Sequence, residues 1–431
     1  MANRCFVDSL AQVSCQKPLS EEWFDSPYIY DVEYVRALDP DIKGLIASSE
    51  ARRMSKILKR AVSTALTALN SSYISHPDAI ITGTGMGCME NSEKFLTDLS
   101  IFGENCLKPT LFMQSTHNTI SSLIAIIIKC HGYNSTYSHK GVSFESALLD
   151  AWIQIKSGWI GNALVGAHDE VTPLMNLVMK RTHPEYSFVS ETSMSTVLTN
   201  TAGSNSICEV TEVKLFHRPE LEELAHLLNE RTDNILLLGV NGNILNDKPY
   251  HDLLKGLSYV PYALQYKNVF GENFSVSALA FYVGAKILEK QSVPVFLSLF
   301  GDKKVSGNFE NVTILNHSDN KIWSMIRLKK LGNLTLYYVA ANRTIYHPKH
   351  YALIRTANTE TGIGKDAAIF LVNSFLGRSS HKLVVYALWA AIWWSFSFMD
   401  VYIKALSIEY GISNGKHGLC IRTYNGGCVP S

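Results

Sequence analysis

The chain has 431 residues, of which 46% are hydrophobic and 18% charged, so it can bury a large core in two or three domains. The formal net charge is +1 and no basic run occurs, which argues against a nucleic-acid-binding protein. The charge is uneven: residues 331–431 hold nine Lys or Arg and four Asp or Glu, which leaves 30 basic and 34 acidic residues before them.

Eight cysteines are scattered along the chain without a C-x-x-C pair, so a zinc site is not expected. The spacings of His131, His139, His168 and His183 fit no compact metal motif either. The first residues contain no apolar segment of the kind found in signal peptides. We therefore expect reduced, mostly buried thiols in a cytoplasmic protein, with neither a metal nor a cofactor.

The first predicted elements are a short strand with a loop over residues 1–20 and an aromatic-rich surface loop over residues 20–37. A helix follows Arg52-Arg53-Met54-Ser55, because apolar residues recur at helical spacing from Ile57 to Leu69. Residues 78–87 are typical of a buried strand that ends in glycines, where the backbone bends tightly or approaches another group.

A polar stretch, Gln114-Ser115-Thr116-His117-Asn118, precedes an apolar run that begins at Ile120. Polar side chains at such a place are typical of a helix N-terminus, because the first-turn amides have no partners within the helix. A helix of this kind, buried in the middle of a domain, can lower the pKa of a nucleophile at its positive end. No cysteine lies between Cys106 and Cys130, however, so the obvious nucleophile is missing.

The remaining elements of the body repeat a strand, turn and helix pattern. They are a helix over 141–155, a strand over 163–167, a strand over 234–239, a helix over 271–287, and a hairpin of 312–316 with 322–328. Strands and helices that alternate with short, Gly-marked turns predict a largely parallel α/β sheet. Because both halves have a polar turn that enters a buried helix, we also predict an internal duplication.

Seven segments resemble the β-ketoacyl synthase family of the thiolase fold, and more closely its chain-length-factor branch in aryl-polyene and flexirubin-type pigment pathways. They are Arg52–Ser55, Thr82–Gly87, Gln114–Thr119, Gly132–Asn134, Phe144–Ala151, Leu245–Asp247 and Gly271–Phe274. The resemblance covers residues 1–330. It implies an α/β, thiolase-like duplicated layered fold of mostly parallel sheets with buried helices, with halves of about 1–205 and 206–330.

An active member of that family needs a cysteine that carries the acyl chain as a thioester, because a thiolate is both nucleophile and leaving group. It also needs two histidines that support decarboxylation of malonyl and stabilise the enolate. The resemblance places Thr119 at the cysteine position, Gly239 at the first histidine and Glu272 at the second. Since all three positions depart from the family pattern, the chain is expected to be non-catalytic by itself.

Each candidate site residue also has a structural interpretation. His117 is a candidate for acting on a carrier-bound substrate, or it satisfies backbone groups of the turn. Thr119 is a slow acyl acceptor or else caps or packs the helix, and Glu272 is a carboxyl with a raised pKa or else caps its helix or pairs with a cation. The turn Asn241-Gly242-Asn243 cradles a phosphate or the carrier arm, or it is an ordinary turn. The predicted pocket residues are Gln114, His117, Asn118, Thr119, Asn241, Asn273 and Phe274.

After Lys330 the family pattern stops, and residues 331–431 are expected to form a helical tail. Residues 383–399 carry no charge and include three tryptophans, so they are a candidate membrane helix or else a buried core helix. Residues 345–424 weakly resemble the membrane-proximal leader of polysaccharide-deacetylase-type proteins. The tail is accordingly a real anchor or the product of a fusion or reading-frame join.

The leading hypothesis is a catalytically degenerate ketosynthase-like subunit, a chain-length factor that pairs with an active ketosynthase and works with an acyl carrier protein. The resemblance implies a cytoplasmic heterodimer in fatty-acid or polyene biosynthesis, with candidate contact to the inner membrane through residues 383–399. Two alternatives stay open. One is an active condensing or acyl-transfer enzyme with an atypical site, and the other is a truncated fusion product without function.

Overall fold

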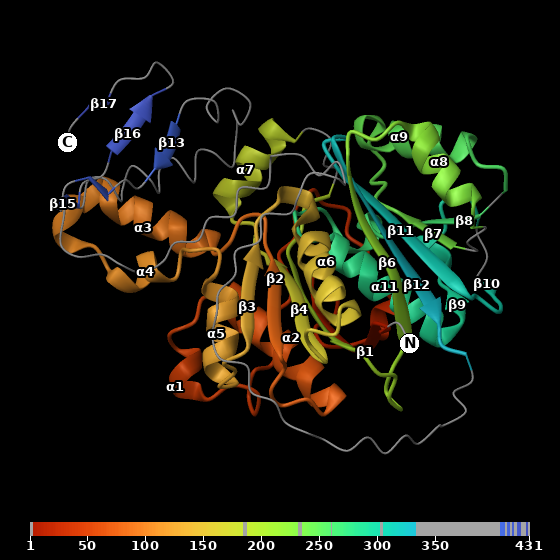
Figure 1. Cartoon of the computed structure of the whole chain (residues 1–431), viewed down its shortest axis with the longest axis horizontal. Coiled ribbons are helices and arrows are strands. Elements are labelled where there is room, and N and C mark those ends of the chain that lie inside the picture. The colour runs from red at the N-terminus through yellow and green to blue at the C-terminus, as the bar shows by residue number, and fades with distance from the viewer. Residues whose placement is uncertain are drawn as a thin grey trace. The chain divides into compact units, whose positions relative to one another are not determined.

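The computed structural model describes residues 3–183, 188–231, 235–259, 261–301 and 305–332, together with short strands between 406 and 429. The chain forms two compact units, one within Met1–Ile363 and the other within Gly364–Ser431. The first unit holds the large sheet and its helices (Figure 1).

The first half of the large unit carries five strands of the sheet. In chain order its elements are β1 (Phe6–Val13), η1 (Glu22–Phe24), α1 (Ser48–Ala51), α2 (Lys56–Ser72), β2 (Ala79–Gly83), α3 (Met89–Phe102), η2 (Gly103–Cys106), α4 (Pro109–Met113), α5 (Thr119–Ile127), β3 (Tyr133–Tyr137), η3 (Lys140–Val142), α6 (Ser143–Lys156), β4 (Asn162–Asp169), α7 (Pro173–Thr182) and β5 (Thr192–Thr199). The predicted helix after Arg52, the strand over 78–87 and the helix over 141–155 are confirmed as α2, β2 and α6.

The second half carries the other five strands of the sheet. Its elements are β6 (Cys208–His217), α8 (Leu221–Asn229), β7 (Ile235–Leu238), α9 (Ile244–Lys255), β8 (Tyr262–Gln265), α10 (Lys267–Phe270), α11 (Ser277–Lys290), β9 (Ser292–Val293), η4 (Val295–Leu297), β10 (Val305–Ser306), β11 (Asn311–Ser318) and β12 (Ile322–Lys330). The predicted hairpin is confirmed, because β11 and β12 pair antiparallel from Asn311–Lys329 to Ser318–Ile322.

The two halves use the same strand order. The sheet runs β3-β2-β4-β5-β1 and continues β6-β12-β11-β7-β8, so the second half repeats the first in mirror order about the β1–β6 junction. The sheet is mixed, and the expectation of a largely parallel sheet is wrong. Four neighbouring pairs are parallel, and the five pairs from β4–β5 through β12–β11 are antiparallel. Strands buried on both faces lack the alternation that reveals antiparallel pairing, which explains the error.

Three apolar clusters place the helices on the sheet. The largest spans both halves and contains α6 and α11, whose Phe144 and Phe281 rings lie 5.5 Å apart. A second cluster packs α2 and α5 against the first-half strands, and a third packs α8 and α9 against the second-half strands. The central helices are therefore α6 and α11.

One expectation about burial is wrong, and another holds for most of its segment. The helix after Thr119 was expected to be the buried middle helix, but α5 lies at the side of the sheet and leaves Ile126 71% exposed. An uninterrupted apolar run does not reveal which face a neighbour covers. The loop over 20–37 lies at the surface for most of its length, as expected, but Trp23 and Phe24 are buried, with Trp23 edge-on against Phe270.

The described parts of the tail are strands and not the expected helices. They are β13 (Leu406–Glu409), β14 (Ile412–Ser413), β15 (Lys416–His417), β16 (Cys420–Thr423) and β17 (Cys428–Val429). The candidate membrane helix over 383–399 lies outside the described residues. Among the helices that are described, none has the length and apolar character needed to cross a bilayer.

Candidate functional site

Thr119, the predicted nucleophile position, is the first residue of α5. Its hydroxyl donates a hydrogen bond to the Met113 carbonyl at 3.0 Å and lies 2.9 Å from the Thr116 hydroxyl. Because Thr119 gives its single proton to Met113, Thr116 must donate to Thr119. The hydroxyl is therefore engaged inside its own turn, but it does not cap α5, whose N-cap residue is Asn118.

His117 packs against the glycine loop that follows β2. A Cβ at Gly87, whose φ is +67°, would lie 3.3 Å from Cγ of His117. Burial lowers the pKa of His117, and the Gly85 backbone opposes that shift by a hydrogen bond. The imidazole is consequently neutral at neutral pH, and it packs on the glycine loop.

The other two polar residues of this stretch differ in their attachment. Gln114 donates from Nε2 to the Arg53 carbonyl at 3.0 Å, and its own carbonyl accepts a bond from Asn91 at 3.3 Å. Gln114 thus ties the turn to α2 and α3. Asn118 is exposed, and its side chain does not cap α5.

Gly239, the first predicted histidine position, has no room for a side chain. A Cβ there would lie 2.5 Å from the Tyr250 hydroxyl and 2.8 Å from Oδ1 of Asn316. Asn316 in turn donates to the Gly141 carbonyl at 3.1 Å, just ahead of α6. The structure therefore brings Gly239 to the start of α6 and not to Thr119.

Glu272, the second predicted histidine position, is held in a buried polar cluster. Its carboxylate lies 3.4 Å from Nζ of Lys267 and accepts a hydrogen bond from Asn241. Glu272 and Lys267 are only 1% and 5% exposed in their side chains. This arrangement agrees with the interpretation that Glu272 pairs with a cation. It also shows that Asn241, a predicted pocket residue, meets Glu272.

Asn273 and Phe274 link the second half to the glycine loop of the first. Asn273 donates to the Ser190 carbonyl at 3.2 Å and to Thr192 at 2.9 Å. A Cβ at Gly85 would lie 2.3 Å from Cβ of Phe274, so the glycine permits this close approach. Both predicted pocket residues are buried at this contact.

Two buried carboxyls in this region were not predicted from the sequence. Asp169 accepts hydrogen bonds from the Gly85 and Met86 amides and from the Thr84 and Ser275 hydroxyls. Glu145 of α6 accepts from Ser277, Ser324 and Asn316. Burial raises the pKa of both groups, while these donors oppose the shift. The signals that could have revealed them are a carboxylate beside Phe144 in the first turn of α6 and the acidic pair Asp169-Glu170 where β4 ends.

Lys267 and Tyr250 were also missed. Lys267 is a lone cation within Tyr266–Phe270, a signal that could have revealed a buried ion pair. Tyr250 is fully buried and stacks on His317 with ring centroids 4.7 Å apart. Only the tertiary structure shows that its hydroxyl occupies the space beside Gly239.

The residues at the start of α6 offer no free nucleophile. Ser143 is fully buried, donates to the Lys140 carbonyl at 2.7 Å and accepts from the His139 amide at 2.8 Å. Nδ1 of His139 lies 3.1 Å from the Ser146 hydroxyl. Across the described residues, no group of three or more His, Cys, Asp or Glu side chains is arranged to hold a metal. Because the Ser146 hydroxyl gives its single proton to the Val142 carbonyl at 3.0 Å, it accepts from His139 and is not activated by it.

One family model matches part of the chain. The description "Beta-ketoacyl synthase, N-terminal domain" matches residues 35–218. No curated protein matches the chain at a significant level.

Solved structures with the same fold are numerous. A type II polyketide synthase acyl-carrier protein in complex with its ketosynthase (AntDE:AntF) has a TM-score of 0.64 at 14% identity, and the ishigamide ketosynthase/chain length factor has 0.64 at 16%. A β-ketoacyl synthase from Burkholderia phymatum STM815 has 0.62 at 13%. Each match covers 77% of this chain and 100% of the other. At these identities the matches show a shared fold.

Proposed function

We propose that this chain, whose residues 35–218 belong to the β-ketoacyl synthase family, is a non-catalytic ketosynthase-like subunit that pairs with an active ketosynthase. One observation carries the proposal: the hydroxyls at both helix starts, Thr119 and Ser143, give their protons to backbone carbonyls of their own turns. A hydroxyl in that state has no base to activate it, and its anion is inaccessible near neutral pH. The usual condensation therefore cannot run.

We also move the family's nucleophile position from Thr119 to the start of α6. This helix is central, and its N-terminal segment is the one that Asn316 joins to Gly239. The segment reads Lys140-Gly141-Val142, so this placement also lacks a cysteine. Either placement leads to the same expectation of a subunit without its own condensing activity.

The edge of the sheet at β3 supports pairing with another chain. This edge strand carries Tyr133, 44% exposed, and the adjacent α5 presents Ile126, 71% exposed. The helical hairpin of residues 89–113, called the arm below, adds Ile101, Phe102 and Met113, each more than half exposed. Exposed apolar groups beside an open sheet edge are typical of a protein interface. A second ketosynthase-fold chain is the partner that we propose for it.

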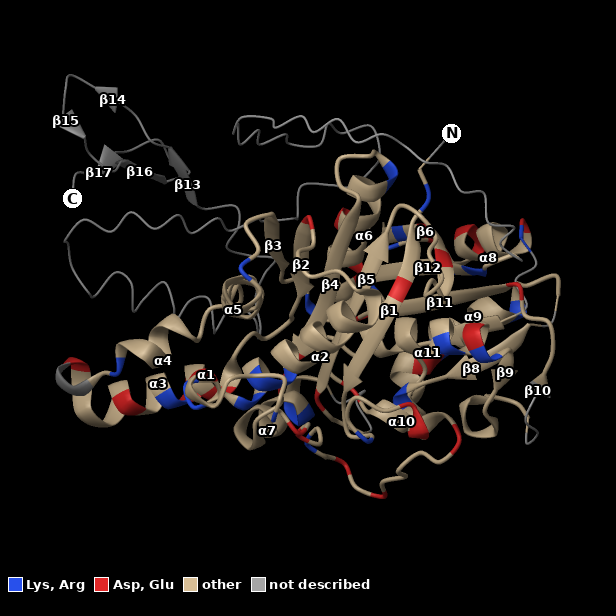
Figure 2. Ribbon diagram, turned by 90° about the horizontal axis from the view of Figure 1, so that it is seen from below, with Lys and Arg blue, Asp and Glu red and all other residues tan. Residues whose placement is uncertain are grey.

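A group of cations near Gln114 supports contact with an acyl carrier protein, taken here as an acidic partner. Arg52 and Arg53 are exposed just before α2, and Lys56, the first residue of α2, is 47% exposed and pairs with Asp39 (Figure 2, Lys and Arg in blue). Gln114 bonds the Arg53 carbonyl, so these cations border the polar stretch before α5. Positive charge at this place favours encounter with an acidic protein.

The finer assignment follows from the resemblance. We propose that the pair works in aryl-polyene or flexirubin-type biosynthesis, where this subunit influences the length of the acyl chain. A cytoplasmic location, with membrane contact through residues 383–399, is part of this proposal.

The test begins with purified chain, radiolabelled malonyl carrier protein and an acyl carrier protein. The chain alone should give no condensation product, while the chain co-expressed with a ketosynthase that has an intact Cys-His-His set should co-purify and give product. Turnover by the chain alone that disappears in His117→Ala would establish the enzymatic alternative.

A matched pair of variants tests the proposed interface. Ile126→Glu on α5 should abolish co-purification, whereas Ile244→Glu, at a residue that is 77% exposed on α9, should leave it intact. Equal binding by both variants, or a stable monomer that binds no ketosynthase, contradicts the pairing.

A further inference from the structure

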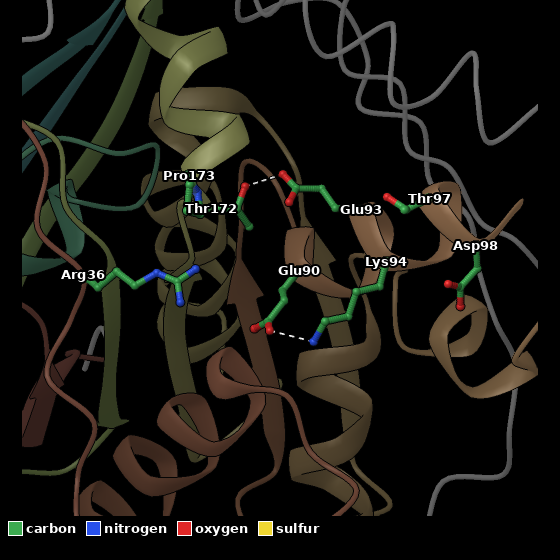
Figure 3. A pocket seen from close by; sticks show the side chains of 8 residues that line it. All are labelled: Arg36, Glu90, Glu93, Lys94, Thr97, Asp98, Thr172 and Pro173. Atoms are coloured by element: carbon green, nitrogen blue, oxygen red, sulfur yellow. Dashed lines mark hydrogen bonds and ion pairs between the residues drawn. The ribbon is translucent and has the colours of Figure 1, made fainter. Parts of the chain in front are cut away.

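Apart from hydrogen bonds to residues 87–88 and 114–119, which adjoin it in the chain, two hydrogen bonds join the arm to the body within the described residues. The Glu90 amide, in the first turn of α3, donates to Oε1 of Glu170 at 2.8 Å. Further along α3, Glu93 accepts a hydrogen bond from Thr172. Beside these contacts an open cleft of about 340 Å³ runs between α3, the start of α7 and Arg36 (Figure 3). The contact at Glu170 is thus the buried part of the arm–body contact, and the cleft is its open part.

Two buried carboxyls, Glu170 and Glu191, lie behind this contact. They differ in the hydrogen bonds and the positive charge that compensate their burial. Glu191, 2% exposed, accepts from Nη1 of Arg60 at 2.8 Å, from the Ala37 amide at 2.8 Å and from the Val171 amide at 3.2 Å. Glu170 is 3% exposed, and no cation of the described chain forms an ion pair with it. Because Glu191 holds the guanidinium, Glu170 is the carboxyl with the poorer compensation for its burial.

The other groups around Glu170 add little positive charge. From α3, the Glu90 carboxylate faces it but pairs with Lys94 at 2.7 Å, and the buried Cys88 thiol lies at the helix start. Arg36 acts on Glu90 and Glu191 across the cleft. Asp169, the neighbour of Glu170 in the chain, accepts hydrogen bonds from the Gly85 and Met86 amides of the glycine loop. Burial, with the charges of Glu191 and Glu90, raises the pKa of Glu170 to about 7, against the Glu90 amide and Arg60.

We propose that Glu170 is a proton-dependent latch that holds the arm against the body. In the closed state the carboxyl is buried beside Glu191, where the neutral form is favoured. When the arm opens, water stabilises the carboxylate, so opening releases one proton to solvent. A rise in pH therefore favours opening, and the first turn of α3 loses its cap as the arm leaves.

The experiment is hydrogen exchange of α3 and α4 amides in the whole chain at pH 6 and pH 8, corrected for the intrinsic exchange rates. With a pKa of about 7 when closed and 4.5 when open, the opening constant should rise about tenfold over this range. Amides of α8, which is remote from Glu170 in the fold, should show no such rise.

The matched variants are Glu170→Gln, which keeps the hydrogen-bond acceptor, and Glu104→Gln, on an exposed residue of the same arm. The first should remove the pH dependence and the second should retain it. A pH-independent arm in the unmodified chain, or an unchanged tenfold rise in Glu170→Gln, overturns the proposal. If Glu170→Gln does not fold, the comparison of the arm with α8 in the unmodified chain decides.

The consequence for partner binding rests on the proposed function, because the arm is part of the surface proposed for the ketosynthase. Arm opening is measured on the chain alone and does not depend on that proposal. If opening rises with pH but the affinity for the ketosynthase does not change, the latch stands and the arm is not part of the interface.

Discussion

Two helix starts in the first half of this protein look alike as sequences and differ in the fold. Gln114–Thr119 leads into α5, and His139–Ser143 leads into α6. At both, a hydroxyl is bonded within its own turn. The start of α5 lies at the side of the sheet, where its helix leaves Ile126 exposed. The start of α6 is in the central layer, where Asn316 reaches it from the second half. Local chemistry marks where a helix begins, but the opposite half of the fold decides which helix start is buried in the centre.

The largest expected effect comes from breaking the buried ion pair that accompanies the start of α6. Lys267→Met leaves the Glu272 carboxylate buried without its cation, so the free energy of unfolding should fall by about 3–5 kcal/mol. Urea denaturation measures this loss. Lys290→Met, which breaks a partly exposed pair with Glu21, should cost about 1 kcal/mol or less. Equal losses would show that the Lys267 pair is not specially placed.

Acid should weaken the same region through His317. Burial and the Lys267 charge lower the pKa of His317 to about 4, from an ordinary value of 6.5. The unfolded chain binds this proton more readily, so stability is lost as pH falls from about 6.5 to 4, by about 3 kcal/mol for this group. His317→Gln should remove that share of the pH dependence. His226→Gln, at an exposed histidine of α8, should leave the profile unchanged.

Adding a methyl group at Gly239 tests whether the Tyr250 hydroxyl is what excludes a side chain from that position. Gly239→Ala places a Cβ 2.5 Å from the Tyr250 hydroxyl, and such overpacking should cost about 1–3 kcal/mol. Adding Tyr250→Phe should recover part of the loss, because the next ring atom is 3.4 Å away. Thermal unfolding measures both variants. If the double variant is no more stable than Gly239→Ala, the hydroxyl is not the obstacle.

The smallest effect compares the two helix starts directly. Thr119→Val removes hydrogen bonds in a partly exposed turn and should cost about 1 kcal/mol or less. Ser143→Ala removes a buried hydroxyl that serves two backbone groups and should cost up to about 2 kcal/mol. A larger loss at Thr119 than at Ser143, by urea denaturation, would reverse the ranking of the two sites.

The sequence alone was sufficient for much of the local structure. Apolar spacing predicted α2 and α6, and two apolar runs around a polar turn predicted the β11–β12 hairpin. The polar stretch before Ile120 correctly marked the start of a helix. These signals are local, because caps and hydrophobic periodicity act within a few residues of each other.

Tertiary structure alone decided the direction of the strands, the central place of α6, and the contact of Tyr250 with Gly239. Strand direction depends on the connections between strands, and burial depends on elements far away in the chain. Glu272 shows the division: its sequence position made it a candidate, but only the fold gave it Lys267 and Asn241 as partners. The sequence thus determined which elements form and which side chains stand at Thr119, Gly239 and Glu272. The packing of one half on the other determined what occupies their place.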